Sequence, residues 1–403
     1  MIRKYRLAVT VMGVMCVTSL FSMPSLSQHQ HDKQRKRSHS PSACTYKEEG
    51  DRCKVLSGDD NGWRHQHRYA AGVCTVSNSE SISDVGGSLT CEALPIDITN
   101  AIFVQRKGSC KHYIHTYEAS VNDVNNSQAF ESGVLIGDEG EVCSITSNAI
   151  PNHDFNDEGA HFGGQVAEVV QVFSVPKEPQ KADSVTYLSQ RVTNAIMLNG
   201  VVLDMIAAGC YQPDNPAADP DGNVNIGCDD NEPWLLDPLS TVHKFGADSH
   251  NAHVQPGGLY HYHGNPNAMF DDSPGPHGSP VIGFAADGFP IYGSYFFDRK
   301  TGSVRKALSG YTVKEGLRPS DPSSPGGSYT GLYVNDYEYT ASGDLDECNG
   351  MSVRGQYGYY VTDNYPWVMK CFVGTPNETF VKNAGVGPPP EDGAGGPPVG
   401  SLP

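Results

Sequence analysis

The segment HNAHVQPGGLYHYHGNP, residues 250–266, carries four histidines within 14 residues. Side chains of a β-strand alternate between two faces, so His261 and His263 are expected to project together. Tyr260 and Tyr262 are then expected to project toward the other face. A transition metal needs three or four converging lone pairs, and neutral imidazole is a favoured ligand of zinc and copper. One strand face therefore offers two ligands for such a metal.

A third ligand is available from the preceding segment. Pro256–Gly258 predicts a turn, so the chain can fold back and bring His253 beside the pair. A His-x-His strand with a third histidine from a neighbouring segment is typical of open zinc sites and of type-2-like copper sites. We therefore predict a zinc or copper site at His253, His261 and His263, with His250 as an additional candidate.

The alternative is that these histidines are hydrogen-bonded structural groups. His-x-His occurs three times in a chain with 15 histidines, beginning at His29, His65 and His261. The first pair lies in a polar arm, and the second has no third histidine nearby in the sequence. The dipeptide spacing alone is therefore poor evidence, and the metal prediction depends on the four histidines around one turn.

An internal comparison separates framework from candidate ligands. GLYHYHGNPNAMF, residues 258–270, resembles GQYGYYVTDNYPWVM, residues 355–369, in its Gly-x-Tyr start and in a proline that follows. In the second copy, Gly358 and Tyr360 replace the His-x-His pair, and Met351 replaces the third histidine. All three candidate ligands are lost together while the neighbouring tyrosines remain. This predicts that the hairpin can fold without the histidines.

Two other residues are weaker candidates for catalysis. His153 in IPNHDF could be a fourth ligand or a substrate-facing group, and a turn histidine is the equal alternative. Asp287 in GFAADGFPIYG lies in an Ala-Asp-Gly turn, where a plain turn aspartate is common. It could instead orient an imidazole or act as a general base.

A loop at residues 219–232, DPDGNVNIGCDDNE, suggests a different cation. Calcium binds six to eight oxygens from flexible acidic loops, and alternate-residue spacing is one way to present them. The glycine is at the fourth position of the loop and not the sixth, so the loop is not an EF-hand. A solvated acidic loop is the alternative. The candidate calcium ligands are Asp219, Asp221, Asn223 and Asn225.

The N-terminus predicts export. MIRKYRLAVTVMGVMCVTSLFSMPSLS has a basic start, a short apolar stretch and small residues after it, which is the layout of a signal peptide. No later segment is apolar enough to cross a membrane. Cleavage near residues 25–28 removes Cys16 from the eleven cysteines and leaves ten, an even number that suits an oxidising compartment. We therefore expect a secreted protein, or a periplasmic one if the source is bacterial.

Composition limits both the fold and the partners. The formal charge is −18, and loss of the three basic residues of the leader makes it −21, which disfavours nucleic acid and anionic membranes as partners. With 44 glycines, 28 prolines and few helical periodicities, we expect a mainly β protein. It combines a large antiparallel domain, with short helices at most, and a small disulfide-rich module. The expected segments are a signal peptide at 1–27, a disordered basic arm at 28–43, a disulfide-rich module at 44–97, the β domain at 98–376 and a flexible Pro/Gly-rich tail at 377–403.

Several motifs in order carry a resemblance to a known family. HNAHVQPGGLYHYHGNP followed by PVIGFAADGFPIYG resembles the YHYH domain family, and so do NAIPNH, IMLNGVVLD and DLDECNG…YYVTDNYPWVMKCFVGTP. The resemblance covers about residues 98–376 and leaves the module at 44–97 unassigned. It implies an exported protein. The family has no settled biochemical activity, so the chemistry has to come from the residues.

Two classes of function follow. In the first, the histidine site is a metal centre of an extracellular hydrolase or oxidoreductase. In the second, the protein is a non-enzymatic binding or matrix protein with structural histidines and a calcium loop. An open coordination position beside an acid or base favours the enzyme, and a closed or metal-free cluster favours the binder. The extracellular ligand or substrate is not indicated by the sequence, which contains no Gly-x-Ser-x-Gly or His-Glu-x-x-His motif.

The cysteines give a direct test of export. The chain has no Cys-x-x-Cys motif, so we expect five disulfides in the mature protein, although the sequence does not choose their connectivity. Thiol titration of the denatured, unreduced mature protein should find about zero reactive cysteines. Two or more free thiols would contradict an oxidising compartment and point to a thiolate site.

Overall fold

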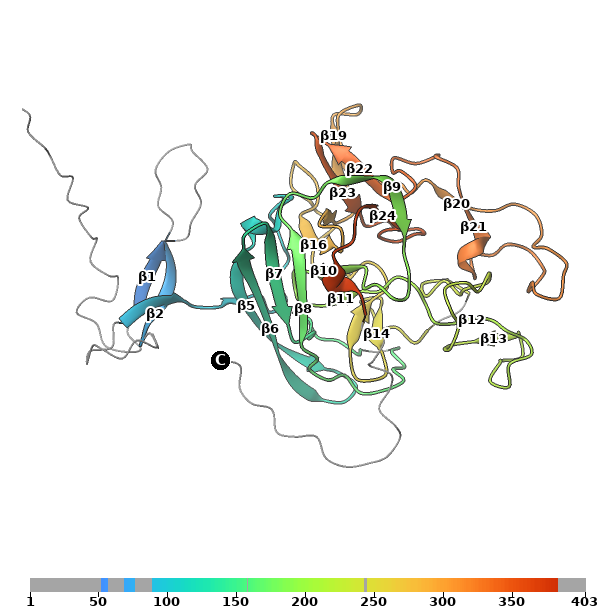
Figure 1. Ribbon diagram of the computed structural model, residues 1–403, viewed down its shortest axis with the longest axis horizontal. Coiled ribbons are helices and arrows are strands. Elements are labelled where there is room, and N and C mark those ends of the chain that lie inside the picture. Colours follow the sequence, from blue (N-terminus) through green and yellow to red (C-terminus); the bar gives the residue numbers. More distant parts are fainter. Residues whose placement is uncertain (1–51, 57–68, 77–88, 158, 243–244, 383–403) are drawn as a thin grey trace, which may run out of the picture.

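The computed structural model describes residues 52–56, 69–76, 89–157, 159–242 and 245–382, with side chains from residue 94 onward (Figure 1). Within these ranges the chain is mainly β, with no α-helix and no helix long and apolar enough to cross a membrane. The predicted fold class is confirmed. The helical elements are three short 3₁₀ turns, η1 (Cys110–His112), η2 (Val334–Asp336) and η3 (Glu378–Phe380).

The centre of the fold is an eight-stranded sheet. Its order is β14 (Ala252–Val254), β15 (Tyr260–Tyr262), β11 (Val202–Leu203), β10 (Ala195–Met197), β16 (Val281–Ala285), β17 (Pro290–Tyr292), β23 (Gln356–Tyr360) and β22 (Gly350–Val353). Two of its pairings, β11 with β15 and β17 with β23, are parallel, and the rest are antiparallel. The sequence predicted antiparallel strands only, because alternation within a strand does not reveal the direction of its neighbour.

A second sheet packs beside the first (Figure 1). It consists of β4 (Ile96–Asp97), β5 (His115–Asp123), β6 (Gln128–Glu139), β7 (Val142–Ser147) and β8 (Gln171–Pro176). Burial alternates along β6: Phe130, Val134 and Ile136 are buried, whereas Glu131 and Leu135 are exposed, as expected for a sheet with one wet face. The buried residues join those of the eight-stranded sheet in one hydrophobic core.

Shorter sheets complete the described fold. The pairs are β12 (Cys210–Tyr211) with β13 (Asn223–Val224), β18 (Tyr295–Asp298) with β19 (Ser303–Lys306), β20 (Tyr311–Val313) with β21 (Tyr337–Tyr339), and β24 (Cys371–Gly374) with β9 (Lys181–Tyr187). A separate three-stranded sheet consists of β1 (Arg52–Leu56), β2 (Tyr69–Val76) and β3 (Leu89–Ala93). The predicted disulfide-rich module includes this sheet. Its cysteine side chains, the leader and the basic arm lie outside the described residues.

Six cysteines form three disulfides between sequence neighbours. The bonds join Cys110 to Cys143, Cys210 to Cys228 and Cys348 to Cys371. None of the six is left as a thiol, so the described part of the chain agrees with the prediction that the cysteines are structural. Each bond joins two separate segments, and Cys348–Cys371 connects the start of the β22–β23 hairpin to β24.

The eight-stranded sheet has two similar halves. Its order places a β14–β15 hairpin and a β22–β23 hairpin at opposite edges, each paired in parallel with one strand of an inner hairpin. The inner hairpins turn at Gly200 and Gly288, which have φ of 84° and 86°. A Cβ at Gly200 would lie 2.3 Å from the Ser147 hydroxyl, and one at Gly288 would lie 3.0 Å from Pro176. Both turns therefore need glycine, for backbone conformation and for contact with the second sheet.

The C-terminal boundary differs from the expectation. Residues 377–382, assigned to the flexible tail by composition, pack on the domain. Phe380 is buried and stacks on Phe173 with ring centroids 4.4 Å apart. The Lys382 backbone N–H donates to the Arg191 carbonyl. The proline-rich composition begins after this segment, which Phe380 and several backbone hydrogen bonds hold on the core.

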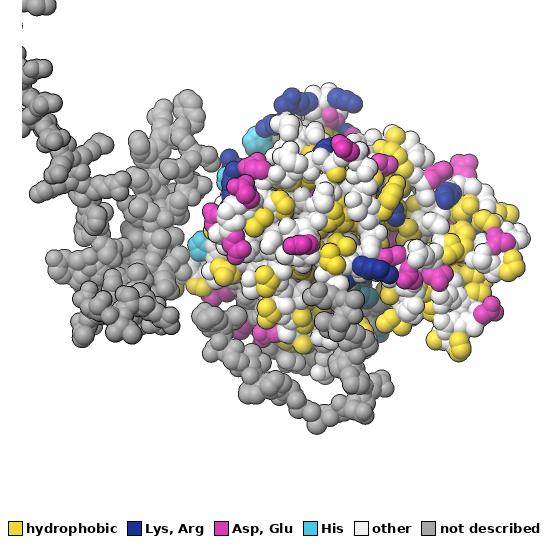
Figure 2. Space-filling model, in the orientation of Figure 1, with side chains coloured by type: hydrophobic (Ala, Val, Ile, Leu, Met, Phe, Trp, Pro, Cys, Tyr) yellow, Lys and Arg dark blue, Asp and Glu magenta, His cyan; other side chains and the backbone are white. Residues whose placement is uncertain are grey.

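The surface agrees with the acidic composition. Figure 2 shows Asp and Glu side chains spread over the visible face, with Lys and Arg side chains mostly in separate places. The Lys and Arg side chains visible in Figure 2 lie mainly along the upper edge of this face.

Candidate metal centre

Two strands bring three histidines together. β14 pairs antiparallel with β15, and this register places His253 directly opposite His261. His263 is two residues further and therefore projects from the same face. The reversal between the strands uses Gly257 and Gly258 at φ of 95° and 90°, as the turn predicted from the sequence requires. The structure thus places together the three residues that sequence analysis proposed as ligands.

The three rings point their Nε2 atoms at one another. Nε2 of His263 lies 3.0 Å from Nε2 of His253 and 3.1 Å from Nε2 of His261. The ligand atoms of all three lie within 4.8 Å of one another, and among the described residues this is the one group of three or more metal-ligand side chains that converges. Three nitrogens bound to one tetrahedral zinc at about 2.0–2.1 Å lie about 3.3 Å apart. A slight spreading of the rings would admit an ion.

Hydrogen bonds to the outer ring nitrogens determine which nitrogens carry lone pairs. Nδ1 of His253 lies 3.3 Å from the Phe245 carbonyl, and Nδ1 of His261 lies 3.3 Å from the Leu259 carbonyl. A carbonyl only accepts, so each Nδ1 carries the proton and each Nε2 is bare. His263 can donate Nε2–H to one of these nitrogens at a time. The Nε2 lone pair that receives no proton still faces another nitrogen, and a cation shared by the three rings would remove this repulsion.

Burial keeps the three imidazoles neutral. It lowers the pKa of all three rings, and for His261 and His263 the repulsion that a protonated His253 would exert lowers it further, to well below the usual range. Neutral imidazole is the form that binds metal. His261 and His263 are buried, whereas His253 is only half-buried. The centre is therefore reached from the solvent past His253.

The tyrosines of β15 face the opposite side, as predicted. Tyr260 and Tyr262 are fully buried. The Tyr262 hydroxyl lies 2.6 Å from Nε2 of His153 and accepts from the Asn199 amide at 2.9 Å. The Tyr260 hydroxyl donates to Asp248 at 2.8 Å. Both tyrosine hydroxyls on this face therefore have hydrogen-bond partners, and the two tyrosines fix the strand in the core.

His153 and His250 lie with the tyrosines and not with the triad. Their rings stack with centroids 3.7 Å apart. Nδ1 of His250 lies 2.7 Å from the Pro266 carbonyl, and Nε2 of His153 is occupied by the Tyr262 hydroxyl. Burial lowers the pKa of His153 to about 3, so the ring stays neutral there. The structure does not bring either residue into the triad, and both have structural partners.

Asp287 is likewise held by structural partners. Its Oδ2 accepts from the Tyr359 hydroxyl at 2.6 Å and from the Gly374 backbone N–H at 2.9 Å, and its Oδ1 accepts from the Phe289 N–H at 3.3 Å. The carboxylate is buried. Asp287 occupies in the second inner hairpin the position that Asn199 occupies in the first. Each of the two contacts the equivalent tyrosine of its half, as Asn199 contacts Tyr262. The structure thus places it as a turn aspartate that anchors Tyr359.

The proposed calcium loop does not present its oxygens to one point. Oδ1 of Asp219 accepts from the backbone N–H groups of Asp221 and Asn223. The Asn223 amide oxygen points inward and accepts from the buried Tyr333 hydroxyl at 2.7 Å. Asp219, Asp221 and Asn225 are exposed. The loop is ordered by Asx-type hydrogen bonds, and calcium remains a prediction without support from this geometry.

Sequence analysis missed a carboxylate and a lysine beside the triad. Asp204 follows β11, and its Oδ2 accepts from the Gln255 amide at 2.9 Å and from the Lys382 ammonium. Its Oδ1 is buried without a hydrogen-bond partner. The negative charge of Asp204 raises the pKa of His253, against the effect of burial. The positive charge of Lys382 lowers the pKa of His261 and His263. No local signal marked them, because Asp204 resembles an ordinary strand-end aspartate.

The second half of the sheet has the same hairpin without the site. In β22–β23, Met351 stands opposite Gly358 just as the two histidines stand opposite each other in β14–β15. This register agrees with the internal comparison. A Cβ at Gly358 would lie 2.6 Å from the Tyr292 ring, which stacks on Tyr360 at 5.1 Å. Aromatic rings therefore fill the space that the triad uses in the first half.

Comparison with known proteins agrees with this organisation. A family model described as YHYH protein matches residues 172–374. This chain belongs to the YHYH protein family. The matched range runs from β8 to β24 and includes both halves of the eight-stranded sheet, whereas the resemblance predicted from motifs began at about residue 98. No curated protein and no solved structure matches the chain.

The two faces of the YHYH tetrapeptide can be tested separately. Tyr262→Phe removes one hydroxyl and leaves His153 and Asn199 unpaired in the core, so we expect the free energy of unfolding to fall by about 1–3 kcal/mol. The metal content should not change, because the triad faces the other way. Urea denaturation and elemental analysis measure the two effects. The control Tyr187→Phe changes an exposed residue and should change neither. Loss of metal without loss of stability in Tyr262→Phe would contradict the assignment of faces.

Proposed function

We propose that this chain is an exported metalloprotein that binds one zinc ion through Nε2 of His253, His261 and His263. The observation that carries the proposal is the convergence of three neutral imidazoles, with Nε2 atoms 3.0 and 3.1 Å apart. Three histidines with a fourth position left open are typical of catalytic zinc sites. Solvent would reach an ion held by the three rings past the half-buried His253, which supports an open fourth position.

Copper is the second candidate ion. Imidazole ligands suit copper as well as zinc, and copper binds more tightly to a given nitrogen site. Three nitrogens on one side of the ion also fit a type-2-like copper centre. The metal supply outside the cell then decides the occupant. Elemental analysis of the purified protein separates the two ions directly.

Hydrolysis is the reaction that the surroundings support best. A zinc ion at this position supplies Lewis acidity to a water molecule or a substrate in the open position. The free Oδ1 of Asp204 is the nearby acceptor for a proton, and burial raises the pKa of this carboxyl, which makes it a better base. Lys382 and Gln255 hold the other oxygen and so fix the carboxylate. An acid or base beside an open position favours an enzyme over a passive binder.

Export is supported by the cysteines. The three disulfides require an oxidising compartment to form and persist. The leader-like N-terminal sequence points the same way. We therefore place the enzyme outside the cytoplasm, acting on an extracellular substrate.

The triple change His253→Ala, His261→Ala and His263→Ala should abolish zinc and copper binding while the domain still folds. The reason for survival is that the β22–β23 hairpin folds with Met351, Gly358 and Tyr360 at these positions. Elemental analysis after metal loading and removal of excess ion gives the stoichiometry, with about one ion expected for the wild type. Circular dichroism checks the fold.

A matched control uses the other His-x-His pair. His65→Ala with His67→Ala removes two histidines outside the described residues and should leave the metal content intact. A wild-type protein that holds no transition metal after loading would show that the triad is structural. Equal metal loss in the control would place the ion elsewhere.

Asp204→Asn tests the catalytic part of the proposal. With one zinc ion bound, the wild type should hydrolyse the model ester 4-nitrophenyl acetate faster than the triple alanine variant does. Removing the base should lower this rate by about tenfold or more while zinc remains bound. Asp183→Asn, at an exposed position, is the control and should keep the full rate. Wild-type activity no higher than that of the triple variant would leave a metal-binding protein without this hydrolytic function.

A further inference from the structure

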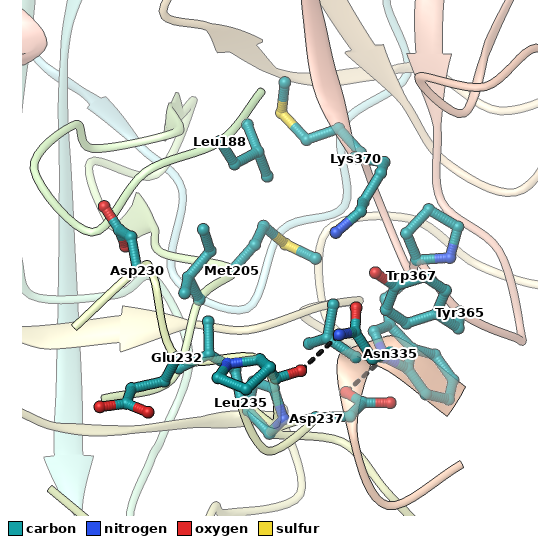
Figure 3. Close-up of a pocket in the computed structure, with 16 residues that line it drawn as sticks. Leu188, Met205, Asp230, Glu232, Leu235, Asp237, Asn335, Tyr365, Trp367 and Lys370 are labelled. Carbon is teal, nitrogen blue, oxygen red and sulfur yellow. Dashed lines mark hydrogen bonds between the residues drawn. The ribbon is translucent and has the colours of Figure 1, made fainter. Parts of the chain in front are cut away.

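A cavity of about 210 Å³ lies apart from the three histidines (Figure 3). Its walls come from the segment after β11, the loop at residues 230–238, η2 and the loop before β24. Leu188, Met205 and Leu235 give it an apolar side, and Trp367 closes another. The volume is below the range of about 300–1,000 Å³ typical of drug-sized ligands, so the cavity suits a small molecule.

One amine projects into this apolar space. Lys370 is partly buried, and Figure 3 shows its amino group pointing into the cavity toward Met205. The amine makes no hydrogen bond or ion pair with any residue in the described part of the chain, and it lies 5.6 Å from the centroid of the Tyr365 ring. The Tyr365 hydroxyl likewise donates to none of the described residues. An amine and a phenol in the same cavity are thus both available to a ligand.

The nearby carboxylates have other partners. Asp237 accepts from the Leu239 backbone N–H at 3.0 Å, from the Trp367 indole at 3.0 Å and from the Tyr337 hydroxyl at 3.1 Å. It attracts Lys370 through space without pairing with it. These three donors give Asp237 a structural role.

Two more acidic residues line the cavity. Asp230 accepts from the Ser189 hydroxyl and the Gln190 N–H, and Glu232 accepts from the Gln212 amide. Figure 3 shows both carboxylates turned away from the Lys370 amine. With three carboxylates and one amine in the lining, an anionic ligand would be repelled. An uncharged ligand suits this balance.

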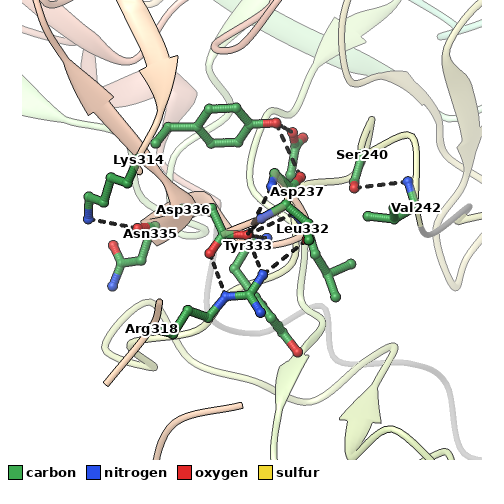
Figure 4. Close-up of polar contacts among 12 residues, drawn as sticks. Asp237, Ser240, Val242, Lys314, Arg318, Leu332, Tyr333, Asn335 and Asp336 are labelled. Atoms are coloured by element: carbon green, nitrogen blue, oxygen red, sulfur yellow. Dashed lines mark hydrogen bonds and ion pairs between the residues drawn. The ribbon is translucent and has the colours of Figure 1, made fainter. Parts of the chain in front are cut away.

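A buried ion pair holds the wall that η2 contributes (Figure 4). Arg318 donates to both oxygens of Asp336 at 2.8 and 2.6 Å. Oδ2 of Asp336 also accepts from the backbone N–H groups of residues 330–333. Asn335, the residue before Asp336, lines the cavity and donates to the Pro233 carbonyl. The cavity is therefore pre-formed by a satisfied polar network.

We propose that this cavity binds a small uncharged aldehyde or ketone and that the Lys370 amine condenses with it to an imine. The geometry is that of a reactive lysine, an unpaired amine on an apolar wall with a phenol beside it. Burial supports this chemistry, since it lowers the pKa of Lys370 to about 8 against the opposing pull of Asp237. About one tenth of the amine is then neutral and nucleophilic at pH 7.

The step is balanced without a further reactant. The Lys370 nitrogen lone pair attacks the carbonyl carbon, and the C=O electron pair moves to the oxygen, which takes up a proton. The nitrogen gives up one proton after the attack and a second as the carbinolamine collapses, the oxygen leaves with two protons as water, and a C=N bond forms. Burial raises the pKa of Tyr365 well above its usual range, so its hydroxyl remains a proton donor for the oxygen that departs.

Benzaldehyde is the probe, because its ring and carbonyl suit an aromatic-lined cavity of this size. The intact mature protein is incubated with it at pH 7, reduced with sodium borohydride, digested and mapped by mass spectrometry. Lys370 should be labelled at least about tenfold faster than the exposed Lys300, because a far smaller fraction of an ordinary lysine is neutral at this pH. Its labelling should also saturate with benzaldehyde concentration, as binding before reaction requires.

Variants separate the cavity from the metal centre. Lys370→Met should lose the fast, saturable labelling, and Lys300→Arg should keep it. Tyr365→Phe should slow it while leaving saturation in place. The triple alanine variant of the histidines should label as the wild type does, so the outcome is independent of the proposed metal function. Labelling of Lys370 in the wild type at the rate of Lys300, or without saturation, would overturn the proposal even if no variant folds.

Discussion

β15 is hydrogen-bonded on both edges, to β14 on one side and to β11 on the other. A strand held in this way cannot rotate, so the side chains of Tyr260–His263 must alternate between the two faces of the sheet. One face receives two hydroxyls that need buried partners, and the other receives two imidazoles. A slip of one residue would exchange them, leaving the hydroxyls without their partners and the imidazoles in the core. The arrangement of the centre follows from this single constraint.

The two halves of the sheet show which residues belong to the scaffold. Tyr262 contacts Asn199 and Tyr359 contacts Asp287, in equivalent positions of the two inner hairpins. The Tyr260 hydroxyl donates to Asp248, and the Tyr357 hydroxyl donates to Asp346 in the same way. Where the first half stacks His250 on His153, the second half has Cys348 in a disulfide. The polar anchors are kept in both halves, and the triad is found in one of them.

The segment after β11 connects the two sites. Asp204 lies beside the triad and holds Lys382, whereas the next residue, Met205, lines the cavity that contains Lys370. On the other side, Gly264 follows the last histidine of the tetrapeptide, and a Cβ there would lie 3.5 Å from Trp367 of the cavity wall. Residues beside the triad and residues of the cavity wall are therefore consecutive in the segment after β11, and Trp367 of the wall lies close to the residue that follows His263. Both sites depend on the same part of the sheet.

The sequence by itself determined the β class, the direction of each side chain in the tetrapeptide and the three converging histidines. These follow from local rules, namely strand alternation and a turn that needs glycine, which act within about a dozen residues. The tertiary structure decided what lies around them. Asp204 and Lys382 are 178 residues apart and meet because the segment around Phe380 packs on the core. His153 joins Tyr262 and not the triad because of long-range packing, which sets its position independently of its spacing in the sequence.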